Sequence, residues 1–160
     1  MVQTGATSEM NAYVMVGAPG SGKSTYAGEI VLRENANIIS GDSIREELYG
    51  DACIQGNWID IHDKIEKYVS ESAELGIPVI LDGTHYRASY RREAIALLRS
   101  YGYTRIEAVV LDSSLATCLA RNFMRKRHVP DYVIKSIHEK LQASLGTIYN
   151  EDFDNITYIY

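Results

Sequence analysis

The sequence predicts an α/β fold in which a five-stranded parallel sheet is covered by helices on both faces. Short apolar runs rich in β-forming residues alternate with longer segments whose apolar residues recur every 3.6 positions, the pattern of consecutive strand–helix–strand units. A glycine-rich motif directly follows the first run, where such sheets bind ligands. The length of 160 residues fits one domain with a single hydrophobic core. We expect residues 12–160 to form that domain and residues 1–11 to be a flexible arm.

The expected strands are the five β-rich runs, and helical segments lie between them. We predict strands at residues 13–16, 37–40, 78–81, 106–111 and 156–159. Helical spacing of apolar residues predicts four helices, over or around residues 22–33, 61–72, 90–101 and 130–145. A further helix, with Leu115, Cys118 and Leu119 on its inner face, can be capped by Ser113 or Ser114. A short helix over residues 43–48 follows the second strand.

Composition narrows the class of protein. Apolar residues make up 46% and charged residues 23% of the chain, as in ordinary globular proteins. No apolar run approaches the ~20 residues of a membrane-spanning helix, and the first residues lack the apolar segment of a secretory signal, so we expect a cytoplasmic protein. Two cysteines and four dispersed histidines predict neither a disulfide framework nor a transition-metal site. A net charge of −5 disfavours extensive binding to duplex nucleic acid but permits a local basic patch.

The clearest motif is the octet GAPGSGKS at residues 17–24, a complete GxxxxGK[ST] pattern between an apolar strand and an amphipathic helix. Its glycines leave room for successive backbone N–H groups to point at a phosphate, and the following helix adds the positive end of its dipole. Lys23 supplies a charge for the β- and γ-phosphates, and the Ser24 hydroxyl is a ligand for Mg²⁺. This P-loop predicts ATP and Mg²⁺ as cofactors, held by the motif and its successor: Gly17, Ala18, Pro19, Gly20, Ser21, Gly22, Lys23, Ser24 and Thr25.

Polar residues after the second strand are candidates for the acceptor site. Asp42 stands where a carboxylate can take a proton from an acceptor hydroxyl, although an aspartate at this position can equally cap the short helix. Arg45, three residues later, lies on the same side of that helix and can hold a substrate phosphate. The alternative for Arg45 is a surface ion pair with Glu46 or Glu47.

The third strand ends in Asp82, which places a carboxylate close to the P-loop serine and its Mg²⁺. A simple turn started by Asp82 and Gly83 is the alternative. Further basic residues follow on the same side of the sheet, and they either line the acceptor site or are merely solvated: Arg87, Arg91 and Arg92.

A second basic group ends the helix that follows the fourth strand: Arg121, Arg125, Lys126, Arg127 and His128. An arginine placed over the triphosphate can neutralise charge in the transition state of phosphoryl transfer. A solvated basic surface is the alternative.

Taken together, four segments resemble the kinase domain of bacteriophage-type polynucleotide 5′-kinases and bacterial RNA-repair end-healing enzymes, which is a P-loop NTPase fold. They are GAPGSGKST at residues 17–25, SGDSIR at 40–45, VILDGTHYRASYRR at 79–92, and ARNFMR followed by VPDYVIKSIHEKL between residues 120 and 141. The resemblance implies that Asp42 is the general base for a 5′-hydroxyl, that Arg45 contacts an acceptor phosphate, and that Asp82 organises the acceptor site. It further implies that Arg125 is the lid arginine on the ATP phosphates, with Arg121 and Arg127 as second choices.

The sequence thus predicts Mg²⁺-dependent transfer of the ATP γ-phosphoryl group to a hydroxyl, with a 5′-hydroxyl nucleic acid or nucleotide as the first candidate acceptor. We assign Asp42, Lys23 and Arg125 to catalysis, Asp42, Arg45, Asp82 and Arg87 to the acceptor, and Ser24 and Asp82 to the metal. A kinase for a nucleoside, sugar acid or antibiotic hydroxyl is the first alternative. A nucleotide-dependent switch without transferase activity is the second.

Overall fold

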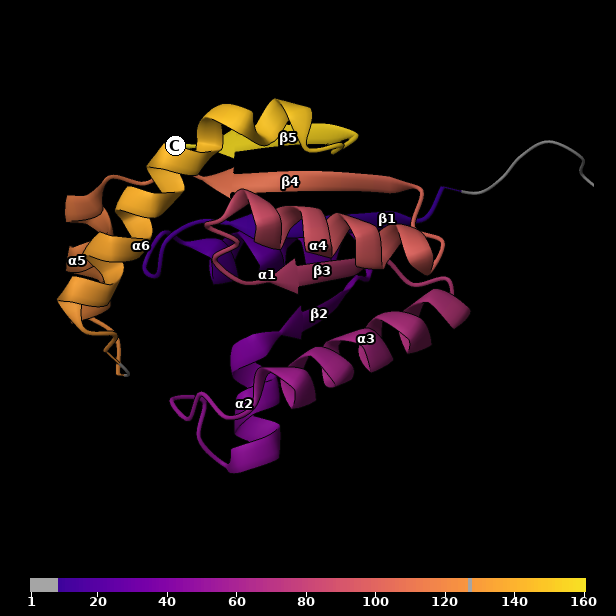
Figure 1. Cartoon of the computed structure of the whole chain (residues 1–160), viewed down its shortest axis with the longest axis horizontal. Helices are drawn as coiled ribbons and strands as arrows, with labels where there is room; N and C mark the ends of the chain where they lie inside the picture. The colour runs from indigo at the N-terminus through magenta and orange to yellow at the C-terminus, as the bar shows by residue number, and fades with distance from the viewer. Residues whose placement is uncertain (1–8, 127) are drawn as a thin grey trace, which may run out of the picture.

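The computed structural model describes residues 9–126 and 128–160 and has the α/β fold that the sequence predicts. All five strands are parallel and lie in the order β2-β3-β1-β4-β5 (Figure 1). The predicted strands are all present, as β1 (Asn11–Val16), β2 (Asn37–Ser40), β3 (Val79–Asp82), β4 (Arg105–Leu111) and β5 (Asn155–Ile159).

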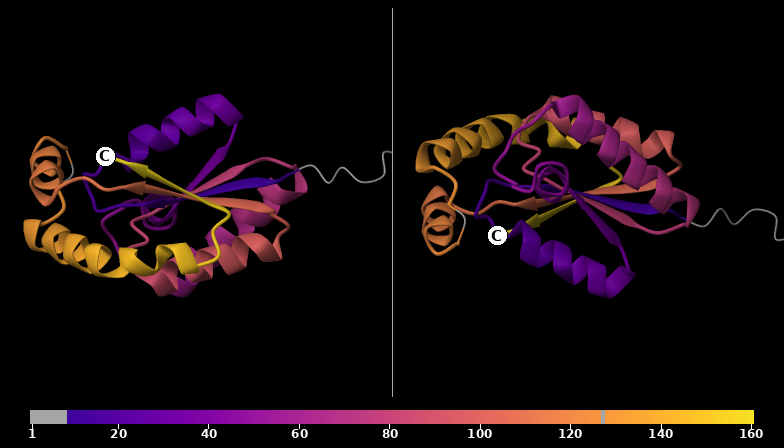
Figure 2. Two further views of the ribbon diagram at one scale, coloured as in Figure 1. Left: turned by 90° about the horizontal axis from the view of Figure 1, so that it is seen from above. Right: turned by 90° about the horizontal axis from the view of Figure 1, so that it is seen from below.

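Helices cover both faces of the sheet. The α-helices are α1 (Lys23–Glu34), α2 (Gly41–Tyr49), α3 (Trp58–Glu74), α4 (Ala88–Ser100), α5 (Leu115–Phe123) and α6 (Asp131–Ser144). Helix α1 lies on one face and α3, α4 and α6 lie on the other, as the two edge-on views of Figure 2 show. Helix α5 packs beside α6 at one end of the sheet. No helix in the described ranges is both long and apolar enough to span a membrane.

Strand β1 lies at the centre of the sheet, and it is apolar on both faces because helices cover both sides of the sheet. Val14 and Met15 are both fully buried, and they point to opposite faces since side chains alternate along a strand. Val14 belongs to the core under α3 and α4, and Met15 belongs to the core under α1. As all strands run the same way, their carboxyl ends meet at one edge, which brings residues far apart in the sequence to one site.

The ends of the elements follow local side-chain chemistry. The Ser114 hydroxyl accepts a hydrogen bond from the Thr117 amide at 3.1 Å, so Ser114 is the cap predicted for α5. A 3-10 helix, η1 (Leu145–Asn150), continues α6 and was not predicted. Of the expected N-terminal arm, residues 1–8 lie outside the described residues, whereas the Met10 carbonyl accepts hydrogen bonds from the amides of Thr104 and Arg105, each at 3.0 Å.

Candidate functional site

The P-loop joins β1 to α1 and can be built only with glycine at several positions. Gly20 and Gly22 have φ angles of 83° and 98°, in the left-handed region that disfavours other residues. A Cβ atom on Gly20 would lie 2.5 Å from the Cys118 carbonyl oxygen, and one on Gly17 would lie 2.5 Å from Ser21 Oγ. The glycines of the motif therefore allow the loop to fold tightly against α5 and its own backbone.

Lys23 lies across this loop. Its Nζ atom donates hydrogen bonds to the carbonyl oxygens of Gly17 and Ala18, each at 2.9 Å. Burial lowers the pKa of Lys23 from its ordinary value to about 8, and the nearby carboxylates of Asp82 and Asp42 only partly oppose that effect. The charge of Arg125 acts in the same direction as burial, so charges from β3, from α2 and from the segment after α5 all act on this one ammonium group.

The loop and its neighbours fit a nucleoside triphosphate with Mg²⁺. Ser21 Oγ is buried and has no hydrogen-bond partner among the described residues, while Ser24 and Thr25 expose their side chains in the first turn of α1. The Ser24 hydroxyl and the Asp82 carboxylate are hard oxygen ligands of the kind Mg²⁺ prefers. Within the described ranges no group of three or more His, Cys, Asp or Glu side chains can hold a metal, so a Mg²⁺ ion here would take its other ligands from phosphate and water.

Asp42 lies in the first turn of α2 and does not cap it. Ser40 is the N-cap, since its hydroxyl accepts a hydrogen bond from the Ser43 amide at 3.3 Å. The capping alternative for Asp42 is therefore wrong. Arg45 Nη1 donates to Asp42 Oδ1 at 3.2 Å, which confirms that the two side chains share one side of the helix.

Arg45 is not paired with Glu46 or Glu47, the alternatives that the sequence left open. Glu47 instead accepts hydrogen bonds from Lys64 and Tyr68 of α3. Arg45 Nε is buried and has no hydrogen-bond partner among the described residues, which leaves it one unused donor beside the Asp42 carboxylate. A buried guanidinium N–H without a partner is costly, so this position favours an added acceptor such as a phosphate oxygen.

Asp82 ends β3 directly beside Ser40, its partner in the parallel register of β2. Burial raises the pKa of Asp82, and the Lys23 charge acts in the opposite direction. The loop after Asp82 is tied to β1 and the P-loop: the Thr84 carbonyl accepts a hydrogen bond from the Gly17 amide at 3.0 Å, and His85 Nδ1 lies 2.7 Å from the Met15 carbonyl oxygen. His85 is thereby held beneath the phosphate loop, where burial lowers its pKa.

Arg91 does not line an open basic surface, as the sequence had suggested. Its side chain is fully buried against Glu151, with Nε to Oε1 at 2.5 Å and Nη2 to Oε2 at 2.8 Å. Arg91 also donates to the carbonyl oxygens of His85 (2.9 Å) and Ser144 (3.0 Å). That prediction was wrong because the partner carboxylate is 60 residues away in the sequence. Arg87 and Arg92, in contrast, are exposed.

The two candidate lid arginines that the structure describes, Arg121 and Arg125, occupy different places. Arg121 Nη1 donates to the Ser21 carbonyl oxygen at 2.9 Å, so its guanidinium rests on the P-loop. Arg125 is exposed beyond the end of α5 and is near enough to act on Lys23. Arg127, the other second choice for a lid arginine, lies outside the described residues.

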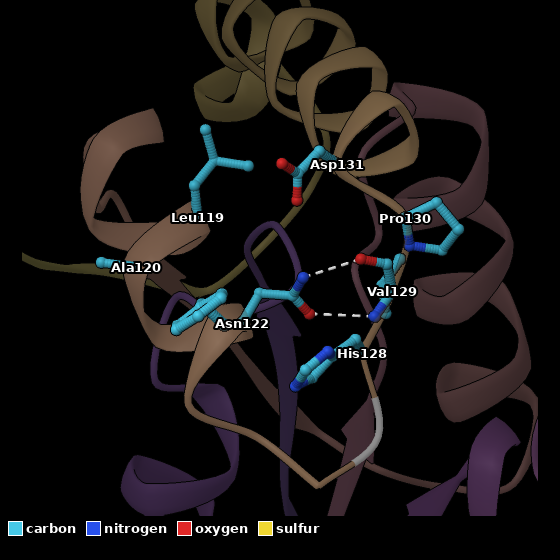
Figure 3. A pocket seen from close by; sticks show the side chains of 8 residues that line it. Leu119, Ala120, Asn122, His128, Val129, Pro130 and Asp131 are labelled. Carbon is cyan, nitrogen blue, oxygen red and sulfur yellow. Dashed lines mark hydrogen bonds between the residues drawn. The ribbon is translucent and has the colours of Figure 1, made fainter.

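Asn122 stabilises the segment between α5 and α6, and sequence reasoning missed it. Its side-chain amide donates to the Val129 carbonyl oxygen at 2.7 Å and accepts from the Val129 amide at 2.9 Å (Figure 3). The side chain is buried at the edge of a cavity of about 570 Å³ between the two helices. Its position, four residues after the buried Cys118 and so on the same helix face, was the available signal.

A second cavity, of about 510 Å³, lies on the other side of the P-loop. Its lining joins the start of α1 to the loop after β4 and to the end of β5, and includes Gly22, Tyr26, Ser113, Arg121 and Tyr160. Because this cavity adjoins the phosphate loop, it is a candidate for the base and sugar of a bound nucleotide.

Comparison with known proteins agrees with this geometry. A family model described as an AAA domain matches residues 13–146. The L-seryl-tRNA(Sec) kinase of Methanococcus maripaludis is 30% identical over 155 residues, which cover 90% of this chain and 57% of that protein. A solved structure of the Pnkp1/Rnl/Hen1 RNA repair complex matches with a TM-score of 0.79 at 21% identity, covering 92% of this chain and 49% of the other. A gluconokinase from Sinorhizobium meliloti 1021 matches with a TM-score of 0.59 at 20% identity, covering 94% and 82%.

The chain thus spans about half the length of the first two of these proteins. The two structural matches are below 25% identity and show the shared fold alone. The family match, in contrast, extends from the first strand through the P-loop to the end of α6, the last α-helix. The chain belongs to the AAA domain family and, with its 2-3-1-4-5 parallel sheet and nucleotide-binding loop, has a P-loop kinase-like fold.

Proposed function

We propose that the protein is an ATP- and Mg²⁺-dependent kinase whose acceptor is a hydroxyl group carried by a nucleic acid or nucleotide, with a 5′-hydroxyl as the first candidate. The observation that carries this proposal is the meeting of Lys23, Asp42 and Asp82 at the P-loop, with the partly unpaired guanidinium of Arg45 beside Asp42. Nucleotide-dependent switches need no carboxylate poised for an acceptor, so this arrangement favours a transferase.

The donor side follows from the P-loop. Backbone N–H groups of residues 17–24 and the Lys23 ammonium bind the phosphates, and the cavity beside Tyr26 and Tyr160 takes the base. Ser24 and Asp82 would hold the Mg²⁺, which would supply neutralisation of the phosphate charge. Arg121 and Arg125 approach from α5 and stabilise the charge that spreads over the transferred group.

The acceptor side is the role we assign to α2. Asp42 accepts the proton of the acceptor hydroxyl as its oxygen forms a bond to the γ-phosphorus, and the bond from that phosphorus to the β–γ bridging oxygen breaks, releasing ADP. Arg45 holds a phosphate of the acceptor with the guanidinium edge that lacks a protein partner. From the end of β3, Asp82 either orients the acceptor hydroxyl directly or would do so through the Mg²⁺ that it would help to hold.

Two relatives suggest other hydroxyls. The name L-seryl-tRNA(Sec) kinase points to a seryl hydroxyl attached to tRNA, and this relative is the 30% identical one. The gluconokinase points to a sugar acid, which matches the small-molecule alternative. The seryl-tRNA alternative keeps the acceptor on an RNA, whereas the sugar acid offers no phosphate for Arg45.

An acceptor panel tests the proposal. Transfer of ³²P from [γ-³²P]ATP is measured for a nucleoside, its 3′-monophosphate, a single-stranded 5′-hydroxyl oligonucleotide, seryl-tRNA and gluconate. We expect the 3′-monophosphate to exceed the nucleoside in kcat/KM, and Arg45→Ala to remove that advantage. The assignment fails if the 3′-phosphate gives no advantage, or if Arg45→Ala leaves the advantage unchanged. If only seryl-tRNA is phosphorylated, the acceptor is a seryl hydroxyl on tRNA. If only gluconate is phosphorylated, the acceptor is a sugar acid.

A further inference from the structure

An aromatic and basic cluster lies at the start of α4, and it includes Arg87, which the sequence assigned to the acceptor without a partner or a mode of binding. It consists of Tyr86, Arg87 and Tyr90, the tyrosine–arginine cluster. The two tyrosine rings meet edge to face, with centroids 5.4 Å apart and planes at 87°. The Arg87 guanidinium carbon lies 5.4 Å from the Tyr86 centroid and 5.9 Å from the Tyr90 centroid, within cation–π range of both.

Two of the three side chains are open to solvent. Tyr90 is 40% exposed, Arg87 is exposed and Tyr86 is partly buried, and the contacts of Arg87 within the cluster are with the two tyrosines. In the described part of the chain Arg87 forms no salt bridge with a carboxylate, and its side chain makes no capping hydrogen bond to α4. Within the described ranges the Arg87 charge is therefore held between two aromatic rings and not neutralised by a carboxylate.

Hydrogen bonds fix the position of the cluster at the end of the loop that joins Asp82 to α4. The Tyr86 carbonyl accepts a hydrogen bond from Ser144 Oγ at 2.8 Å, and the preceding His85 carbonyl accepts one from Arg91. The same loop begins at Asp82 and is bonded to the P-loop through Thr84.

Aromatic rings combined with cations are the means by which proteins hold single-stranded nucleic acid: bases stack on the rings and phosphates pair with the cations. An acceptor whose reacting hydroxyl lies at Asp42 would carry its next nucleotides away from the P-loop. The loop that begins at Asp82 leads from that point to the cluster within four to eight residues. A sugar acid or a free nucleoside is too short to use both places.

We infer that the tyrosine–arginine cluster is a second binding site for a single-stranded nucleic-acid acceptor, in which a base stacks on Tyr90 while Arg87 holds a backbone phosphate. This inference rests on the proposed function for the identity of the acceptor. The cluster would recognise a nucleotide of the substrate next to the one that carries the reacting hydroxyl.

Direct binding tests the site independently of phosphoryl transfer. The probe is a single-stranded oligonucleotide with a free 5′-hydroxyl and a 3′-fluorophore, titrated with protein while its anisotropy is measured. Tyr90→Ala should weaken binding by about five- to hundredfold, as expected for the loss of one stacked base, and Tyr90→Phe should retain it. Arg87→Ala should make the slope of log K against log salt shallower by about 0.7, the value for one single-strand phosphate contact.

Matched controls lie elsewhere on the surface. Tyr149→Ala removes an exposed tyrosine from η1, and Arg33→Ala removes an exposed arginine near the opposite end of the sheet. Both controls should bind the probe like the wild type. If Tyr90→Ala and Arg87→Ala also bind like the wild type, the inference is overturned.

Kinetics then separate this inference from the proposed function. In the variants of the cluster, the ratio of kcat/KM for the oligonucleotide to that for the nucleoside 3′-monophosphate should fall, mainly through KM. An unchanged ratio with normal oligonucleotide phosphorylation overturns the second site and leaves the proposed function standing. Oligonucleotide binding that depends on the cluster, without any phosphorylation by the wild type, supports the site and overturns the proposed function.

Discussion

Asp42 is the residue whose chemistry decides between a transferase and a switch. Because Ser40 caps α2, Asp42→Asn leaves the cap in place and should change the free energy of unfolding by less than about 1 kcal/mol. Loss of the base should lower kcat on the order of 10²- to 10⁴-fold while ATP affinity changes little. Turnover, equilibrium ATP binding and thermal unfolding measure the three quantities. Asp60→Asn, which changes a carboxylate in the first turn of α3, is the matched control, and normal turnover of Asp42→Asn would exclude the role of base.

Lys23 gives the donor site a pH dependence. Its pKa of about 8 in the free protein lies below the ordinary value because the ammonium is buried, whereas bound phosphates would stabilise the charged form and raise the pKa. ATP binding should therefore take up a proton at and above pH 8, and the affinity should fall as the pH rises through that range. Calorimetry in buffers with different ionisation enthalpies measures the uptake. The assignment to Lys23 is wrong if Lys23→Met still binds ATP with the same proton uptake.

At the scale of elements, α5 and the residues just after it bring Arg121 and Arg125 towards the P-loop, and the two arginines differ in how they contact it. Arg121 already rests on the P-loop carbonyl groups, whereas Arg125 reaches the field of Lys23 from beyond the helix end. We predict that Arg125→Ala lowers kcat by about 10³-fold and weakens ATP binding much less, because its charge is needed mainly in the transition state. Single-turnover rates and ATP dissociation constants for Arg121→Ala, Arg125→Ala and the control Lys126→Ala test this. Equal effects in all three variants would indicate a diffuse basic surface instead.

Helices and strands with a local sequence pattern could be predicted from the sequence. Features that depend on residues far apart in the sequence could not. The alternation of β-rich runs and helical spacing gave all five strands, and the serine before α5 gave its cap. The extension of α6 by η1 has no such local signal. Arg91 has the sequence context of a solvated helix residue, and only the fold brings Glu151 to it.

The same division applies to the site. The P-loop is specified by consecutive residues and was predictable, as was the sharing of one helix side by Asp42 and Arg45, three residues apart. The contact of Arg121 with the Ser21 carbonyl joins residues 100 positions apart, so the sequence alone ranked Arg121 behind Arg125 without a geometric reason. Asn122 was missed because its partners are backbone atoms of a segment without regular structure.

For the molecule as a whole, the parallel sheet shows how the proposed polyanionic acceptor could be bound by an acidic protein. All strands end at one edge of the sheet, and cations of the P-loop, α2, the end of α5 and the tyrosine–arginine cluster lie on the loops and helices that follow them. The net charge of −5 is a sum over the whole chain and does not describe this edge. Attraction of the substrate then depends on local contacts rather than on the total charge.

Arg91 and Glu151 form a buried pair that links the loop after Asp82 to η1 and the residue that follows it. We predict that this loop and η1 open to solvent as one cooperative unit. Removing one partner of such a pair costs about 3–5 kcal/mol, because it leaves an uncompensated charge. In native-state hydrogen exchange, amides of residues 83–87 and of residues 145–151 should share one opening free energy, and Glu151→Gln should lower both equally. Independent opening of the two segments would contradict the link. A protease, a binding partner or a substitution that loosens the turn after α6 would consequently disorder the loop after Asp82, without touching any residue to which we assign a contact with the acceptor.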